Sequence, residues 1–189
     1  MRQGFGITGV CPLWFAIKRS EGWYQYNRIG PPFLALWGRL PRATPFESID
    51  SIDAEFLRAR GIRALVLDVD NTLTAHGSQH LAPHVEHWLQ EMRQAGVEMR
   101  ICSNNFEKRV RPFAEKIGLP FVSFSLKPAS RGLRLARRAF GLKKSQMALV
   151  GDQIFTDVLA AKLYGIPVLM VQPLAPDIKW NIRLKRHLE

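Results

Sequence analysis

Short apolar runs alternate with amphipathic stretches along most of the chain after residue 61. The apolar runs predict five strands, at residues 64–68, 97–102, 121–124, 147–150 and 167–171. The stretches between them predict helices at residues 83–95, 106–117, 129–140 and 154–164. Each helix is followed at once by a glycine, the residue that most often ends a helix. This alternation is typical of an α/β fold with a central parallel sheet of about five strands.

Two carboxylates follow the first predicted strand. The run Ala64–Leu67 has no polar alternation and leads into Asp68, Val69 and Asp70. Such a run indicates a strand covered on both faces, as in parallel sheets. Side chains two positions apart in a strand point the same way, so Asp68 and Asp70 are expected to emerge together where α/β sheets bind ligands. Two adjacent acids repel each other, and a bound metal or a shared proton relieves that repulsion.

Polar residues of a definite kind also follow the later strands. They are Ser103, Asn104 and Asn105 after the second strand, Lys127 near the third, and Asp152 and Asp157 after the fourth. A carboxylate can attack a phosphomonoester without first losing a proton, which makes Asp68 the candidate nucleophile. Asp70 can protonate the leaving group and then activate water. Four acids around a phosphate require cations, and Lys127 with Mg²⁺ would supply them.

The order and types of these residues resemble the haloacid dehalogenase (HAD) superfamily of phosphotransferases. Its D-x-D-x-T, Ser/Thr, Lys and G-D-x-x-x-[TD]-D signatures all have counterparts in this chain. The resemblance implies a Rossmann-like three-layer sandwich around the parallel sheet, and an aspartyl-phosphate intermediate on Asp68.

The resemblance also implies a role for each matching residue. The metal ligands are Asp68, the main-chain carbonyl of Asp70, and Asp152; the phosphate-binding residues are Ser103, Asn104 and Lys127; the supporting residues are Thr72 and Asp157. Asp157 is expected to orient Lys127 or a metal-bound water. The implied cofactor is Mg²⁺.

Cap modules set substrate choice in this superfamily, inserted after the first strand or between the second and third. The intervals from Asp68 to Ser103 and from Ser103 to Lys127 are already filled by predicted elements. We therefore expect no cap domain. An open site can admit a phosphate carried on a lipid, a protein or a nucleic acid.

A longer match narrows the resemblance to the YqeG family of class IIIA phosphatases. It rests on residues 61–74, Ser103-Asn104-Asn105, Lys127-Pro128, residues 151–158 and Pro173-Leu174-Ala175. That family is related to mitochondrial phosphatidylglycerophosphate phosphatase, which implies hydrolysis of phosphatidylglycerophosphate to phosphatidylglycerol. Two alternatives stay open: a phosphatase for nucleic-acid ends, nucleotides or phosphoproteins, and a basic phosphate-binding module without enzymatic activity.

The composition favours polyanionic partners. The chain has 27 lysines and arginines against 16 acids, a formal net charge of +11. A phospholipid substrate and peripheral contact with an anionic membrane agree with this charge, and contact with nucleic acid is less favoured. The longest uncharged stretch, residues 3–17, is shorter than the ~20 residues that a spanning helix needs. The two cysteines suggest no disulfide framework, so we expect a cytoplasmic protein that contacts the inner face of the membrane.

Residues 1–46 differ from the rest of the chain. They contain Trp14, Trp23 and Trp37, other aromatic residues, and six basic residues against the single acid Glu21. This composition suits a membrane interface, although an extension that is poorly ordered, packs on the core or is not translated remains open. Residues 47–189 are assigned to the HAD-like phosphatase domain, which begins with a helix that leads to Gly61.

Overall fold

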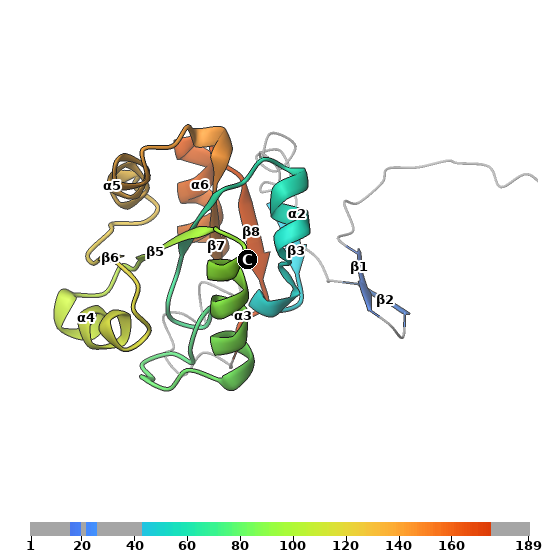
Figure 1. Cartoon of the computed structure of the whole chain (residues 1–189), viewed down its shortest axis with the longest axis horizontal. Helices are drawn as coiled ribbons and strands as arrows, with labels where there is room; N and C mark the ends of the chain where they lie inside the picture. Colours follow the sequence, from blue (N-terminus) through green and yellow to red (C-terminus); the bar gives the residue numbers. More distant parts are fainter. Residues whose placement is uncertain (1–15, 20–21, 26–42, 175–189) are drawn as a thin grey trace, which may run out of the picture.

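The computed structural model describes residues 43–174, together with the backbone of residues 16–19 and 22–25 (Figure 1). The two short segments are β1 (Ala16–Arg19) and β2 (Gly22–Gln25), which pair antiparallel. The tryptophans and the basic residues of the N-terminal segment, and the basic residues of the tail after residue 174, lie outside the described side chains.

Six parallel strands form the central sheet, in the order β3-β8-β7-β4-β5-β6. Their bounds are β3 (Ala43–Phe46), β4 (Ala64–Leu67), β5 (Glu98–Cys102), β6 (Phe121–Val122), β7 (Met147–Gly151) and β8 (Val168–Val171). All five predicted strands are present, which confirms the α/β class.

The sixth strand, β3, lies in the stretch that the sequence assigned to the N-terminal segment. It pairs parallel with β8, with Ala43 opposite Val168. Pro45 is compatible with this place because β3 forms one edge of the sheet, where a missing N–H can be tolerated. The sheet therefore begins before the predicted boundary at residue 47.

Helical elements connect the strands. They are η1 (Ile49–Ser51), α2 (Ala54–Ala59), α3 (Pro83–Gln94), α4 (Glu107–Lys116), α5 (Arg131–Phe140), η2 (Lys144–Gln146), η3 (Ile154–Val158) and α6 (Leu159–Tyr164). The four predicted helices are confirmed, with two local differences. Helix α5 begins at Arg131 rather than at Ala129. The fourth helix opens with a π-helical turn, η3, a feature often found at functional sites.

Alternate residues of β4 enter two different cores. Leu65 and Leu67 pack in the core that contains Trp88 of α3 and residues of α2 and α4, whereas Ala64 and Val66 pack with residues of α5 and α6. All four β4 side chains are fully buried. Helices therefore cover both faces of the sheet, which explains the unbroken apolar run and confirms the three-layer sandwich (Figure 1).

Strand order places the predicted site at the centre of the sheet. From β4 the chain continues to β5 and β6 on one side, then crosses to β7 and β8 on the other. The carboxyl ends of β4, β5 and β7 therefore meet at a topological switch point, the usual ligand site of such sheets. Within residues 68–120 the helices are α3 and α4, and no cap domain interrupts them. No helix of the described residues is long and apolar enough to span a membrane.

Candidate active site

Asp68, the predicted nucleophile, leaves the sheet directly after β4. Its backbone N–H still donates to the carbonyl of Val150 in β7, at 2.9 Å. Its carboxylate accepts a hydrogen bond from Lys127 Nζ at 2.5 Å and is almost completely buried. Burial raises the pKa of Asp68 to about 7, although Lys127 acts in the opposite direction. The β4 pairing thus holds a carboxylate whose negative charge is only partly compensated.

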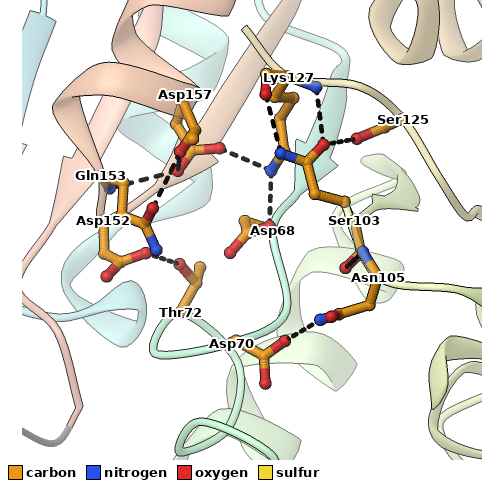
Figure 2. A network of polar contacts seen from close by, with 12 residues as sticks. Asp68, Asp70, Thr72, Ser103, Asn105, Ser125, Lys127, Asp152, Gln153 and Asp157 are labelled. Carbon is orange, nitrogen blue, oxygen red and sulfur yellow. Dashed lines mark hydrogen bonds and ion pairs between the residues drawn. The ribbon is translucent and has the colours of Figure 1, made fainter. Parts of the chain in front are cut away.

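Lys127 connects two carboxylates. Its Nζ donates to Asp68 and, at 2.6 Å, to Oδ1 of Asp157, and the lysine side chain is 1% exposed. Burial by itself lowers the pKa of Lys127, but Asp157 and Asp68 outweigh that effect and raise it above its usual range. Lys127 therefore stays an ammonium. Two of its three N–H donors bind these carboxylates, which leaves the third for an anionic ligand (Figure 2).

Asn104 holds the loop that carries Lys127. Its Oδ1 accepts from the backbone N–H of Lys127 and from Oγ of Ser125, both at 2.7 Å, and its Nδ2 donates to the carbonyl of Lys127 at 2.9 Å. The side chain of Asn104 is thus engaged with Lys127 and Ser125, and a contact of Asn104 with phosphate through its main-chain N–H stays a prediction. Ser103 is buried, and its hydroxyl oxygen accepts from the N–H of Asn105 at 3.2 Å, so its O–H can donate to a phosphate oxygen.

Asp157 is fixed within the π-helical turn η3. Its Oδ1 binds Lys127, while its Oδ2 accepts from the N–H of Gln153 and Oγ1 of Thr156, both at 3.2 Å. Gly151, at the end of β7, allows this placement, because a Cβ at that position would lie 2.4 Å from Cγ of Asp157. Both carboxylate oxygens are therefore occupied. Asp157 thus contacts Lys127 directly, and its role in orienting Lys127 or a metal-bound water stays a prediction.

Three buried carboxylates gather beside Lys127. Oxygens of Asp68, Asp152 and Asp157 lie within 4.8 Å of one another. Asp152 also accepts from Oγ1 of Thr72 at 3.4 Å, which ties the predicted supporting threonine to the cluster. Three carboxylates and one ammonium leave excess negative charge in a buried site. Their oxygen donors suit a hard divalent cation, so the cluster fits the metal role predicted for Asp68 and Asp152.

Asp70 does not join this cluster, contrary to the expectation that it points the same way as Asp68. The alternation of side chains stops because β4 ends at Leu67. Asp70 Oδ1 accepts from the N–H of Gly77 at 2.8 Å and from Arg109 at 3.1 Å, and its Oδ2 accepts from Nδ2 of Asn105. Figure 2 shows Asp70 turned towards Asn105 and away from Lys127. In this conformation both oxygens of the predicted acid are engaged.

Arg109 of α4 also belongs to the site, although its sequence motif did not indicate this. Its Nη2 donates to Asp70 and, at 2.7 Å, to the carbonyl of Ser78, so it joins α4 to the loop after β4. Its Nη1 is buried and has no hydrogen-bond partner within residues 43–174. Asn105 and Arg109 both bind Asp70, and they lie four residues apart in the sequence. This spacing, about one helical turn, is the sequence feature that could have indicated the role of Arg109.

Comparison with known proteins agrees with this arrangement. Residues 75–165 match a family described as "Hydrolase: haloacid dehalogenase-like hydrolase". The chain is also 34% identical over 143 residues to the "Probable phosphatase YqeG" of Bacillus subtilis, a match that covers 76% of this chain and 83% of that protein. The chain belongs to the YqeG family of HAD-like phosphatases. The protein is therefore a phosphatase, and the predicted family is confirmed.

More distant relatives extend the comparison. "Phosphatidylglycerophosphate phosphatase 1, chloroplastic/mitochondrial" of Arabidopsis thaliana is 25% identical over 148 residues, covering 73% of this chain and 42% of that protein. The chain thus spans less than half the length of that relative. A crystal structure of an uncharacterized protein from Listeria monocytogenes has a TM-score of 0.51 at 15% identity, covering 62% of this chain and 85% of that chain. That likeness concerns the fold alone.

Proposed function

We propose that this phosphatase is a Mg²⁺-dependent phosphomonoesterase that converts phosphatidylglycerophosphate to phosphatidylglycerol through an aspartyl-phosphate on Asp68. The proposed type of reaction rests on the surroundings of Asp68. Asp68 is a buried carboxylate, held by β4, in contact with a permanently charged Lys127 and within a cluster of carboxylates. This combination supports the proposal, because a carboxylate able to attack phosphorus, an ammonium able to bind phosphate and oxygen atoms able to bind a metal lie close together.

The proposed reaction consists of two phosphoryl transfers, the first to Asp68 and the second to water. Asp68 attacks phosphorus, and the bond from phosphorus to the ester oxygen breaks while Asp70 protonates the departing alkoxide. Water then attacks the phosphorus of the aspartyl-phosphate as Asp70 takes its proton, which releases inorganic phosphate and frees Asp68. Lys127 and the Ser103 hydroxyl hold phosphate oxygens during both transfers. In this proposal Oδ2 of Asp70 exchanges its contact with Asn105 for the leaving group, while Arg109 keeps Oδ1 in place.

The metal role follows from the donor set. Asp68 and Asp152, with the main-chain carbonyl of Asp70, would hold Mg²⁺, while Asp157 keeps its contact with Lys127. When bound, the ion neutralises the carboxylates and polarises the phosphoryl group.

Three observations support a lipid phosphate as substrate. The similarity to the Arabidopsis phosphatidylglycerophosphate phosphatase names that class of substrate for a relative. The described domain has no cap to enclose a small metabolite. The chain's net charge of +11 favours approach from the cytoplasmic side to an anionic membrane.

A substrate panel tests the proposal. Phosphate release is measured from phosphatidylglycerophosphate in mixed micelles, nitrophenyl phosphate, a 5′-phosphorylated oligonucleotide and a phosphopeptide, each with chelator and with Mg²⁺ restored. We expect chelator to abolish turnover, and kcat/KM for the lipid to exceed the others by at least about tenfold. Equal rates on all four substrates would contradict the lipid assignment, and turnover in chelator would contradict the metal assignment.

A further inference from the structure

Three large apolar side chains are exposed beside the catalytic loops. Phe106, Phe124 and Leu126 are 72%, 49% and 44% exposed, and we call them the apolar rim. The rings of Phe106 and Phe124 stack, with centroids 5.5 Å apart and an interplanar angle of 14°. The rim comes from two separate loops, after β5 and after β6, so its formation depends on the fold rather than on one local sequence.

Two of the three rim residues, Phe124 and Leu126, adopt backbone conformations that carry an energetic cost. Phe124 and Leu126 have φ angles of 45° and 61°, in the left-handed region that bulky residues rarely adopt. Ser125 between them is fully buried and binds Asn104. Residues held in such conformations are often found at functional sites. The loop therefore buries its serine and exposes its two apolar residues.

Hydrogen bonds fix the rim to the catalytic residues. The N–H of Phe124 donates to the carbonyl of Asn105 at 2.8 Å, and the N–H of Ser125 donates to the carbonyl of Ser103 at 3.0 Å. Leu126 directly precedes Lys127, and Phe106 directly follows Asn105, which binds Asp70. A surface that engages the rim is therefore brought next to the phosphate-binding residues.

Positive charge borders the rim. The sequence contains no acid between Glu115 and Asp152, the interval that includes Phe124, Leu126 and all of α5. Arg131, at the start of α5, is exposed and donates to the carbonyl of Phe124 at 3.1 Å. Arg134 lies one helical turn further along and is also exposed. Figure 1 shows β6 at the sheet edge between α4 and α5.

We propose that the apolar rim, with Arg131 and Arg134 of α5, is the surface by which the protein docks on an anionic lipid bilayer. The proposal rests on the proposed lipid phosphatase function and assigns it a surface. Aromatic and aliphatic side chains enter the boundary between headgroups and acyl chains, while arginines bind headgroup phosphates. A polynucleotide fits less well, because the two rings already cover a face of each other and Leu126 offers no aromatic face for a base.

A double variant tests the docking surface. Phe106→Ser combined with Phe124→Asn removes both rings, and asparagine adopts the left-handed conformation more readily than phenylalanine. Leu163→Ser is the matched control, because Leu163 of α6 is 65% exposed and lies outside the rim. Binding is measured by sedimentation with vesicles of phosphatidylglycerol and phosphatidylcholine, and with phosphatidylcholine vesicles alone. Melting temperatures confirm that each variant is folded.

We expect wild type and Leu163→Ser to bind the anionic vesicles equally, and the double variant to bind at least about tenfold more weakly. The ratio of turnover on lipid phosphate in vesicles to turnover on nitrophenyl phosphate should fall by a similar factor. Binding by the double variant that equals wild type would overturn the proposal. So would wild-type binding to neutral vesicles as tight as to anionic ones, or ring-dependent binding of an oligonucleotide in place of vesicles.

The outcomes also separate this proposal from the proposed function. If wild type binds anionic vesicles through the rings yet releases no phosphate from phosphatidylglycerophosphate, the docking surface stands and the substrate assignment fails. If wild type and the double variant hydrolyse that lipid in vesicles equally well, the function stands and the docking surface fails.

Discussion

Lys127 Nζ lies 2.6 Å from Oδ1 of Asp157, and both side chains are 1% exposed. The same ammonium binds Asp68 at 2.5 Å, so one buried cation joins the predicted nucleophile to a second acid. The contact with Asp157 therefore helps to fix the position of the ammonium that binds Asp68.

Removal of Asp157 should affect both stability and catalysis. Asp157→Ala leaves Lys127 buried with one partner instead of two, and breaking a buried ion pair costs about 3–5 kcal/mol. Urea denaturation measures this loss, and steady-state kinetics should show a fall in kcat larger than any rise in KM. Asp50→Ala, at an exposed acid, is the control for unfolding. Wild-type stability in Asp157→Ala would contradict the account of this pair.

Gly151→Ala should act through the same aspartate. The added Cβ would lie 2.4 Å from Cγ of Asp157 and force that carboxylate away from Lys127. We expect a loss of about 1–3 kcal/mol in stability, the range for overpacked sites, together with reduced kcat. Because both substitutions displace one carboxylate, Gly151→Ala and Asp157→Ala combined should cost less than the sum of their separate effects. Strict additivity in denaturation would mean that they act independently.

Arg109 should control how Asp70 is presented. Arg109→Gln removes the charge that holds Asp70 at 3.1 Å, and we expect kcat to fall by about tenfold with a smaller change in KM. Arg109→Lys keeps the charge and should restore part of the activity. Arg111→Gln is the matched control on the same helix, because Arg111 is half exposed and pairs with Glu107 and Glu115. Equal losses in Arg109→Gln and Arg111→Gln would rule out a specific role for Arg109.

The pKa of Asp68 predicts how stability depends on pH without metal. Folding raises this pKa from 3.8 to about 7, so between those values the folded chain binds more protons than the unfolded chain. The contribution of Asp68 to stability therefore declines as pH rises through this window. In chelator, wild type should lose stability relative to Asp68→Asn as pH increases from about 4 to about 7. A constant difference between the two proteins would show that Asp68 keeps its ordinary pKa.

Most strands and helices could be predicted because their signals are local. The run Ala64–Leu67 is apolar at every position, and burial on both faces of the sheet requires that. β3 could not be predicted in this way, because Ala43–Phe46 lacks such a run and becomes a strand through pairing with β8. The parallel order of the sheet also explains why polar residues after separate strands come together.

The direction of individual side chains was harder to predict. Lys127, Asp68, Asp152 and Asp157 converge as the motifs indicated, but the turn of Asp70 depends on where β4 ends. In the sequence, Arg109 looks like any charged residue on an amphipathic helix. Its contact with Asp70 depends on the packing of α4 beside the loop after β4. The exposure of Phe124 depends on a left-handed backbone conformation that could not be predicted from the sequence.

The proposed mechanism depends on an aspartyl-phosphate at Asp68, and chemical trapping tests for this intermediate most directly. The enzyme is mixed with saturating substrate and Mg²⁺, quenched in acid, reduced with borohydride and digested for mass spectrometry. Borohydride reduces an acyl phosphate to an alcohol, so an aspartyl-phosphate becomes homoserine. We predict substrate-dependent homoserine at position 68 and none in Asp68→Asn. Homoserine at position 70 instead, or turnover without any substrate-dependent reduction, would contradict the assignment of Asp68 as the nucleophile.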